Sequence, residues 1–257
     1  MIRYAIISDI HGNLEALKAV LSDIKTQQID RVVCLGDIIS KGTHGHECLQ
    51  LIKENADAVV RGNNDIYYTK TLDEIANNPN FDYDYFYWIQ KQLSGDDINF
   101  LRNLPMCCEF KLSGRLVRCF HASSEDTESC VFNFSDYDEK LTLFNPSKYS
   151  TKEVADVVVY GHIHHPSYEK LFGYTLINAG SVGNALNCLS DKSVNNVKMS
   201  EFTMAEYLIL TGSDGKEVED IAVEFRNVKY NKSKELEDYG YSPHKAIYEN
   251  EIYNGEY

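Results

Sequence analysis

The sequence predicts an α/β fold in which a parallel β-sheet packs against a second, more antiparallel sheet. Over the first 60 residues, short apolar runs alternate with segments of helical periodicity. The connections between these runs are short, which requires right-handed crossovers and therefore parallel strands. After residue 106, strand-like runs follow one another without helices between them.

The amino-terminal part begins with a strand, a helix and a second strand. Residues 2–8 are apolar and rich in β-branched side chains, as expected of a buried strand. Asn13 is the expected N-cap of a helix over residues 14–24, whose leucines and isoleucine share one face. Residues 31–35 predict the second strand.

A second helix and a third strand complete the parallel unit. Residues 46–54 show helical spacing, and residues 57–60 are a short apolar run. Residues 66–105 are instead rich in Tyr, Asp and Asn, with helical spacing around 85–93 and 98–104. We expect this segment to be a helical excursion over the sheet.

The second sheet is expected from six runs in the remaining chain. They are residues 107–112, 116–120, 157–160, 174–177, 207–210 and 221–225. Gly114 and Gly173 mark hairpin turns, and the polar residues 189–204 predict a loop. We expect one domain over residues 1–228 and a carboxy-terminal extension over 229–257.

Charge and cysteine content exclude several classes of function. The net charge of −14 argues against binding of nucleic acid or an anionic membrane through the general surface. Seven cysteines without a Cys-x-x-Cys pair exclude a disulfide framework and a zinc ribbon. The apolar run at the amino terminus is too short for a signal peptide, and no stretch is long enough to span a membrane. We therefore expect a cytoplasmic protein with buried, reduced thiols.

Metal-binding side chains follow five of the predicted strands directly. They are Asp9 and His11, Asp37, Asn63, His121, and His162 and His164. Ligands of open α/β sheets bind outside the carboxyl ends of the strands, so these distant residues can converge. Three glycines next to them leave room for a crowded cluster, namely Gly36, Gly62 and Gly161.

Two pairs of candidate ligands are separated by one residue. In extended backbone, residues two apart point the same way, so Asp9 with His11, and His162 with His164, are expected to act as pincers. The set contains carboxylate, amide and imidazole groups but no thiolate, which suits Mn²⁺, Fe or Zn²⁺. Seven side chains exceed the need of one ion, and Asp37 can bridge two. Two ions about 3.5–4 Å apart form a clamp for displacement at phosphorus.

Five sequence blocks resemble those of the calcineurin-like metallophosphoesterases. The blocks are Asp9-x-His11, Gly36-Asp37, Gly62-Asn63-x-Asp65, His121 and Gly161-His162-x-His164, in that order. Three longer stretches, GDIISKGTHGHECLQLI, YFYWIQKQLSGDDINFLRNLP and NAGSVGN, are similar to a bacterial phosphodiesterase branch that also resembles the asymmetric diadenosine tetraphosphate hydrolases. The resemblance covers about residues 1–228 and implies a pair of mixed sheets sandwiched between helices.

The resemblance also implies roles for the candidate residues. One ion would be held by Asp9, His11, Asp37 and His164. The other would be held by Asp37, Asn63, His121 and His162. A hydroxide between the ions would attack phosphorus, and since metal coordination lowers the pKa of water to about 7, no protein base is required.

This chain departs from the family pattern at Asn64, where many relatives carry a histidine. An amide can donate a hydrogen bond to a phosphoryl oxygen but cannot deliver a proton at neutral pH. Asn64 therefore favours leaving groups that need little help, such as a nucleotide, whose terminal phosphate has a second pKa near 6. Asp65 is expected to orient Asn64 or a ligating histidine. Arg61 and His165 are candidates for substrate binding, with a solvated or ion-paired side chain and a rim position as the plain alternatives.

The predicted function is that of a dinuclear metal-dependent phosphoesterase acting on phosphodiester or phosphoanhydride bonds of nucleotide-type substrates. Manganese is the expected metal, with iron or zinc as alternatives. A phosphomonoesterase or protein phosphatase, and a non-catalytic scaffold on the same fold, remain open, as does a homo-oligomeric state. A nuclease is disfavoured by the acidic charge. The aromatic run over residues 83–88 is typical of core packing or an oligomer surface, with a base-stacking platform as the alternative.

Overall fold

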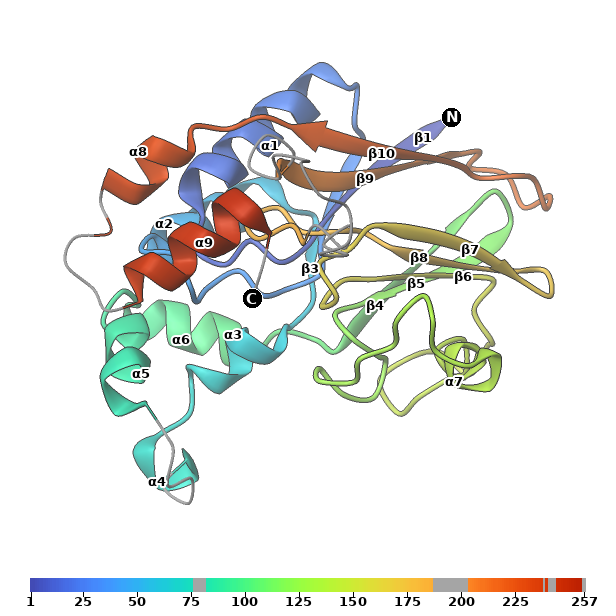
Figure 1. The fold of residues 1–257 in the computed structure, drawn as a ribbon. Coiled ribbons are helices and arrows are strands. Elements are labelled where there is room, and N and C mark those ends of the chain that lie inside the picture. The colour runs from blue at the N-terminus through green and yellow to red at the C-terminus, as the bar shows by residue number, and fades with distance from the viewer. Residues whose placement is uncertain (76–81, 187–202, 238, 240–243, 256–257) are drawn as a thin grey trace.

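Two five-stranded β-sheets stack face to face, and helical segments cover the outer face of each (Figure 1). The computed structural model of the chain describes residues 1–75, 82–186, 203–237, 239 and 244–255. The predicted α/β class with two packed sheets is confirmed. Within the described ranges, no helix has the length and apolar character needed to cross a bilayer.

The first sheet contains the parallel unit predicted at the amino terminus. Its strands are β1 (Ile2–Ile7), β2 (Arg31–Cys34), β3 (Ala58–Val59), β9 (Ala205–Gly212) and β10 (Ala222–Val228). They run in the order β10-β9-β1-β2-β3, and β1, β2 and β3 are parallel. Two helices cover its outer face, α1 (Leu14–Thr26) and α2 (Gly45–Asn55). Asn13 caps α1 as predicted, because its side chain accepts a hydrogen bond from Ala16 N at 3.0 Å.

The second sheet is mixed, and so is the first, which corrects the expectation of a parallel sheet packed on a more antiparallel one. Its strands are β4 (Cys107–Leu112), β5 (Arg115–Phe120), β6 (Val157–Tyr160), β7 (Ser167–Leu171) and β8 (Tyr174–Asn178). They run in the order β4-β5-β6-β8-β7, with β5, β6 and β8 parallel and the two edge strands antiparallel. The hairpin turns fall at Gly114 and Gly173 as predicted. A short helix, α7 (Tyr137–Thr142), lies beside this sheet, apart from the other helices (Figure 1).

The placement of the last two strands corrects the sequence prediction. We grouped residues 207–210 and 221–225 with the second sheet, but β9 pairs antiparallel with β1 and β10 pairs with β9 in the first sheet. The pairing makes β1 a central strand. Ile6 then faces the second sheet, while Ala5 and Ile7 face the helices. Burial on both faces explains why this strand is a continuous apolar run rather than an alternating one.

The predicted helical excursion consists of short helices packed on the same core as the first two helices. They are α3 (Asn63–Tyr67), α4 (Leu72–Ile75), α5 (Tyr83–Gln90) and α6 (Gly95–Arg102). Asp82 and Ser94 cap α5 and α6 with their side chains. Residues 76–81 of the expected excursion lie outside the described residues, as do residues 189–202 of the expected loop.

The carboxy-terminal residues pack against the sandwich. They form two helices, α8 (Lys232–Glu237) and α9 (Lys245–Asn254), and the sequence did not indicate α9. The buried Glu235 carboxylate accepts a hydrogen bond from Glu15 N in the first turn of α1 at 3.1 Å. Figure 1 shows α8 and α9 on the same side of the molecule as α1 and α2. The six cysteines within the described residues are free, and four of them are buried, as predicted.

Candidate metal centre

The seven candidate ligands lie just beyond the carboxyl ends of parallel strands in both sheets. Asp9 follows β1, Asp37 follows β2, and Asn63 opens α3 after β3. His121 follows β5 directly, and the pair His162 and His164 comes after β6. Because these strand ends lie at one edge of the stacked sheets, residues separated by more than 150 positions come into contact.

The backbone at the ligands is not extended, which corrects the argument made for the two pairs. Asp9 and His11 have φ values of 54° and 52°, and His162 and His164 have φ values of 64° and 58°. These are left-handed conformations, so each pair is held in a turn rather than on a strand. The turn after β1 is fixed to the turn after β2, because Asp9 N donates to Gly36 O at 3.0 Å and His11 N donates to Asp37 O at 2.9 Å.

One group of donors joins the turn after β1 to the turn after β6. His164 Nε2 lies 3.1 Å from Asp9 Oδ1 and 3.0 Å from His11 Nε2. His11 Nε2 is 3.8 Å from Asp9 Oδ1. The ligand atoms of these three residues lie within 4.8 Å of one another, and all three side chains are buried. This spacing suits a single cation between them.

A second group lies around His121. Its Nε2 is 2.9 Å from Asn63 Oδ1, 3.2 Å from His162 Nδ1 and 3.6 Å from Asp37 Oδ2. Asp9, Asp37 and His121 again have ligand atoms within 4.8 Å of one another. Asp9 thus contributes to both groups, whereas we expected only Asp37 to contact both metal ions. Asp37 Oδ2 also lies between the groups, at 3.7 Å from His11 Nε2.

Two imidazoles are oriented by backbone carbonyls behind them. His121 Nδ1 is 3.0 Å from Leu35 O, and His164 Nδ1 is 2.8 Å from Asn184 O. A ring nitrogen that donates to a carbonyl fixes the tautomer in which the other nitrogen carries a free lone pair. Both rings therefore present Nε2 to the centre as a metal ligand.

Burial and mutual charge set the protonation of the cluster. Burial lowers the pKa values of His11, His121 and His162, so these imidazoles are neutral. Burial alone would raise the pKa of Asp9, but the surrounding imidazoles, led by His164, hold it well below its usual range. Burial and the neighbouring Asp9 carboxylate raise the pKa of Asp37 to about 6. A divalent cation would favour the ionised form of Asp37.

The residues present fit a divalent metal ion. Asp9 Oδ1 and His11 Nδ1 are buried and lack a hydrogen-bond partner among the described residues. A buried carboxylate oxygen without a donor is costly unless a cation neutralises it. Neutral imidazoles and carboxylates are also the donor types that Mn²⁺, Fe and Zn²⁺ accept.

Asn64 and Asp65 act on the loop that carries Asp37. Asn64 donates twice to the Asp37 carboxylate, from its backbone N at 2.8 Å and from Nδ2 at 2.5 Å. Asp65 is fully buried and accepts from Asp37 N at 2.8 Å and from Gly62 N at 3.0 Å. We expected Asp65 to orient Asn64 or a histidine, but its hydrogen-bond partners are backbone amides. Burial and the Asp37 carboxylate raise the pKa of Asp65 to about 7.

Arg61 and His165 are the two predicted substrate-binding residues. Arg61 Nε donates to Leu104 O at 2.6 Å, which ties its side chain to the end of α6. His165 is half-buried directly after His164. Their roles in substrate binding stay predictions.

Three residues near the centre were missed by sequence reasoning. The Ser8 hydroxyl donates to Asp9 Oδ2 at 2.5 Å, and the exposed Cys130 Sγ lies 3.4 Å from His162 Nε2. Lys41, five residues after Gly36, is largely buried and lies 3.2 Å from Glu251 of α9. Ser8 directly precedes the predicted ligand Asp9, whereas Cys130 and Lys41 lie outside the strand-end blocks and only the folded chain brings them to the site.

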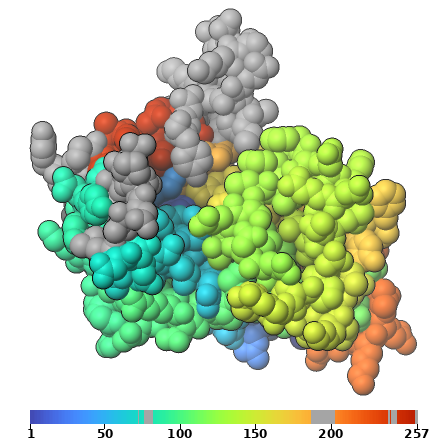
Figure 2. Space-filling model, turned by 90° about the horizontal axis from the view of Figure 1, so that it is seen from below, coloured from blue at the N-terminus to red at the C-terminus, as the bar shows by residue number. Residues whose placement is uncertain are grey.

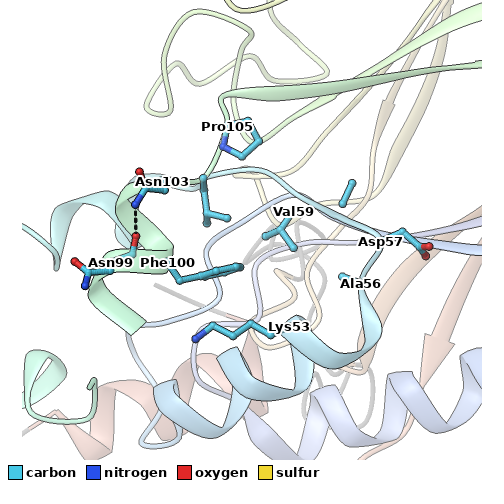
Figure 3. A pocket seen from close by; sticks show the side chains of 10 residues that line it. Lys53, Ala56, Asp57, Val59, Asn99, Phe100, Asn103 and Pro105 are labelled. Atoms are coloured by element: carbon cyan, nitrogen blue, oxygen red, sulfur yellow. Dashed lines mark hydrogen bonds between the residues drawn. The ribbon is translucent and has the colours of Figure 1, made fainter. Parts of the chain in front are cut away.

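In the space-filling view, the cyan segment that carries α3 lies next to the yellow-green segment around α7 (Figure 2). A pocket of about 600 Å³ lies beside β3 and α6, with Lys53, Asp57 and Phe100 in its wall (Figure 3). Its charged groups are engaged, because Lys53 pairs with Asp97 and Asp57 pairs with Arg31. It contains none of the candidate ligands.

Sequence comparisons agree with this geometry. Residues 2–197 match the sequence model of the calcineurin-like phosphoesterase superfamily domain. An uncharacterised protein of Methanocaldococcus jannaschii is 33% identical over 186 residues, which cover 69% of this chain and 69% of that protein. A symmetrical bis(5'-nucleosyl)-tetraphosphatase of Haemophilus influenzae is 28% identical over 114 residues, covering 37% of this chain and 41% of that enzyme. The motifs predicted a bacterial phosphodiesterase branch of the same family that also resembles the asymmetric tetraphosphatases.

Structural comparisons support the fold. A metallophosphoesterase of Sphaerobacter thermophilus has a TM-score of 0.72 at 23% identity, covering 99% of both chains. A hypothetical protein of Pyrococcus horikoshii has a TM-score of 0.76 at 16% identity, covering 100% of this chain and 99% of that one. Both matches extend through the carboxy-terminal helices of this chain.

Proposed function

This chain belongs to the calcineurin-like phosphoesterase superfamily, and we propose that it is a dinuclear, metal-dependent phosphoesterase that cleaves phosphodiester or phosphoanhydride bonds of nucleotide-type substrates. The family is one of hydrolytic phosphoesterases. For this chain, we propose the identity of the metal, the number of metal ions and the class of substrate.

The observation that carries the proposal is the position of Asp37 between two sets of donors. Its Oδ2 lies 3.7 Å from His11 Nε2 on one side and 3.6 Å from His121 Nε2 on the other. A carboxylate in this place can serve two ions at once. We propose manganese as the metal, with iron or zinc as alternatives.

The candidate ligands would hold positive metal charge at the place where a phosphate binds. When bound, two divalent ions acidify a coordinated water and neutralise phosphate charge. In a chain of net charge −14, this local positive charge is what allows an anionic substrate to approach. Asp65 holds the backbone of Asp37 and so keeps the bridging carboxylate in position.

Asn64 supports the choice of substrate class. Its amide lies beside Asp37 and can donate a hydrogen bond to a phosphoryl oxygen, but it supplies no proton to a departing alkoxide. Substrates whose leaving group is already stable as an anion are therefore favoured. Nucleotides and activated diesters meet this condition.

The test is metal-dependent hydrolysis of bis-p-nitrophenyl phosphate by protein first stripped of metal and then supplied with Mn²⁺. We expect activity only with metal, and a loss of at least about 100-fold in Asp37→Ala and His162→Ala, because several kcal/mol of transition-state stabilisation are removed. Asp138→Ala, at an exposed position in α7, is the control and should keep full activity. Circular dichroism checks that each variant is folded.

Hydrolysis that persists after exhaustive chelation, or in the Asp37 and His162 variants, would refute the assignment. Metal analysis of the same samples supplies a second readout. We expect about two ions per chain in the wild type and fewer in both variants. Diadenosine polyphosphates, cyclic nucleotides and monoesters then rank the substrate classes.

A further inference from the structure

A pocket of about 280 Å³ opens beside the candidate metal centre. Asn64 is part of its wall, and the same side chain donates to the Asp37 carboxylate at 2.5 Å. Ser40 and Lys41 also line it, and the adjacent Gly42 N donates to His11 O at 2.8 Å. One layer of residues therefore separates the pocket from the candidate ligands.

Aromatic side chains from three parts of the chain form much of the pocket wall. They are Tyr68 after α3, Tyr85 in α5, and Tyr239 between α8 and α9, and Ile247 of α9 joins them. We call this the tyrosine pocket. The rings of Tyr68 and Tyr85 meet edge to face, with centroids 6.2 Å apart. The pocket thus requires both the helical excursion and the carboxy-terminal segment.

Two of the tyrosine hydroxyls, those of Tyr85 and Tyr239, are bonded to one loop residue. Lys41 N donates to Tyr85 Oη at 3.1 Å, and Tyr239 Oη donates to Lys41 O at 2.7 Å. These tyrosines therefore offer the pocket mainly aromatic carbon. They also hold Lys41, whose φ is 58°, in a left-handed conformation.

The polar groups of the pocket wall connect it to the metal centre. Lys41 Nζ lies 3.2 Å from Glu251 Oε2, so these two charges neutralise each other in the wall. Asn184 Nδ2 also donates to Glu251 Oε2 at 2.8 Å, and Asn184 O faces the His164 ring. The amide of Asn64, which contacts Asp37, is the donor of the wall that adjoins the candidate ligands.

We propose that the tyrosine pocket binds the nucleobase of the substrate, with Asn64 at the side of the pocket that adjoins the metal centre. Aromatic side chains bind bases by stacking, irrespective of base identity. The volume is close to the lower end of the range for small-ligand pockets, about 300–1,000 Å³, so it accommodates one ring system rather than a peptide. The position of the phosphate in this arrangement rests on the proposed function.

The test uses nucleosides, which lack phosphate, and protein freed of metal by chelation. Ile247 is 57% exposed, so Ile247→Trp can fill the pocket from the surface without disturbing the core. Ala246→Trp, the adjacent exposed position of α9 outside the pocket, is the matched control. We expect adenosine or another of the four common nucleosides to bind the wild type and the control equally, and to bind Ile247→Trp at least tenfold more weakly, by ligand-observed NMR titration.

Two outcomes would overturn the proposal: no nucleoside binds the wild-type protein, or Ile247→Trp and Ala246→Trp bind nucleosides equally well. Neither outcome depends on metal or on catalysis. Conversely, nucleoside binding together with a failure to hydrolyse bis-p-nitrophenyl phosphate would refute the proposed function and leave the base pocket standing. Titration of the same protein with ribose shows whether the base is the part recognised.

Discussion

Five of the seven candidate ligands have left-handed backbone, although none is glycine. They are Asp9, His11, Asp37, His162 and His164, with φ between 51° and 64°. Such a conformation costs an ordinary residue roughly 1–2 kcal/mol, and Asp and His tolerate it better than most. Hydrogen bonds between the turns, such as Ile10 N to Asp37 O at 2.8 Å, offset the cost. The turns therefore fix the ligand geometry before any ion binds.

Two glycines are required by close approach rather than by flexibility. A Cβ at Gly62 would overlap the Asp37 carboxylate, and a Cβ at Gly161 would overlap the Ser8 hydroxyl. Each glycine precedes a candidate ligand, so the backbone of one strand end passes directly over a side chain from another. The predicted role of these glycines in making room for the cluster is confirmed by these contacts.

We propose that Asn64 limits which leaving groups can be cleaved, and a substitution tests this role. We expect Asn64→His to raise the kcat for esters with poor, alkoxide-type leaving groups by tenfold or more, because a positioned general acid contributes about 10²–10⁴-fold. Hydrolysis of bis-p-nitrophenyl phosphate should change little by comparison. The measurement is the slope of log kcat against leaving-group pKa, which should become shallower in the variant. An unchanged slope would contradict the role given to Asn64.

The sequence identified the candidate ligands more completely than it identified the tyrosine pocket. Ligands could be predicted because each lies within four residues of the end of an apolar strand, and strand ends converge in this class of fold. The left-handed turns were not predicted, because Asp and His tolerate this conformation without requiring it. The tyrosines and Lys41 come from separate helices and loops, and only tertiary packing brings them together.

At the scale of elements, the contact between α2 and α6 depends on one buried carboxylate. Asp97 is fully buried and accepts from His46 at 2.6 Å, from Lys53 at 2.8 Å and from Ser94 Oγ at 2.7 Å. Burial raises the pKa of Asp97, but Lys53, His46 and Ser94 together hold it well below its usual range. The ionised carboxylate both caps α6 and joins it to α2.

We expect Asp97→Asn to lower the free energy of unfolding by about 2–4 kcal/mol at neutral pH, since it leaves Lys53 without its counter-charge. In the wild type, the pKa of Asp97 in the folded state lies below its value in the unfolded chain, about 3.9. The stabilisation by the ionised carboxylate is therefore present at neutral pH and is lost as the pH falls below about 4. Urea unfolding at several pH values should show a weaker acid dependence in Asp97→Asn. Asp96→Asn, at the adjacent exposed position, is the control, and equal pH dependence in both variants would contradict the prediction.

Helices and strands were predicted correctly where the local sequence pattern determines the type of element. The prediction failed where long-range strand pairing determines the sheet to which a strand belongs. The amino-terminal strands and helices were predicted because their apolar periodicity is strong and their connections are short. β7 and α7 were missed because their sequences, SYEKL and YDEKLT, are mostly polar. The strand character of β9 was evident, but its partner β1 is more than 190 residues away, and no local signal specifies such a pairing.

At the scale of the molecule, the sandwich and the carboxy-terminal helices form one packed unit. Tyr239 and Tyr248 stack with ring centroids 5.0 Å apart, and Trp88 of α5 lies 5.3 Å from Tyr239. Tyr248 is almost fully buried. This small aromatic core connects α9 to the helical excursion. The parts of the tyrosine pocket that come from α5 and from α9 therefore depend on it.

The single tryptophan of the chain makes this docking measurable. In the wild type we expect unfolding in urea to give coincident transitions by Trp88 fluorescence and by far-ultraviolet circular dichroism, as a cooperative unit should. Tyr248→Ala removes a buried aromatic ring, a loss worth about 3–5 kcal/mol, and should move the fluorescence transition to lower urea than the dichroism transition, because α9 separates before the sheets unfold. Tyr137→Ala, at a ring that is 60% exposed in α7, should leave both transitions in place. If the two transitions of Tyr248→Ala stay coincident, the carboxy-terminal helices do not separate on their own, and the sandwich and its extension fold as one unit even without this contact.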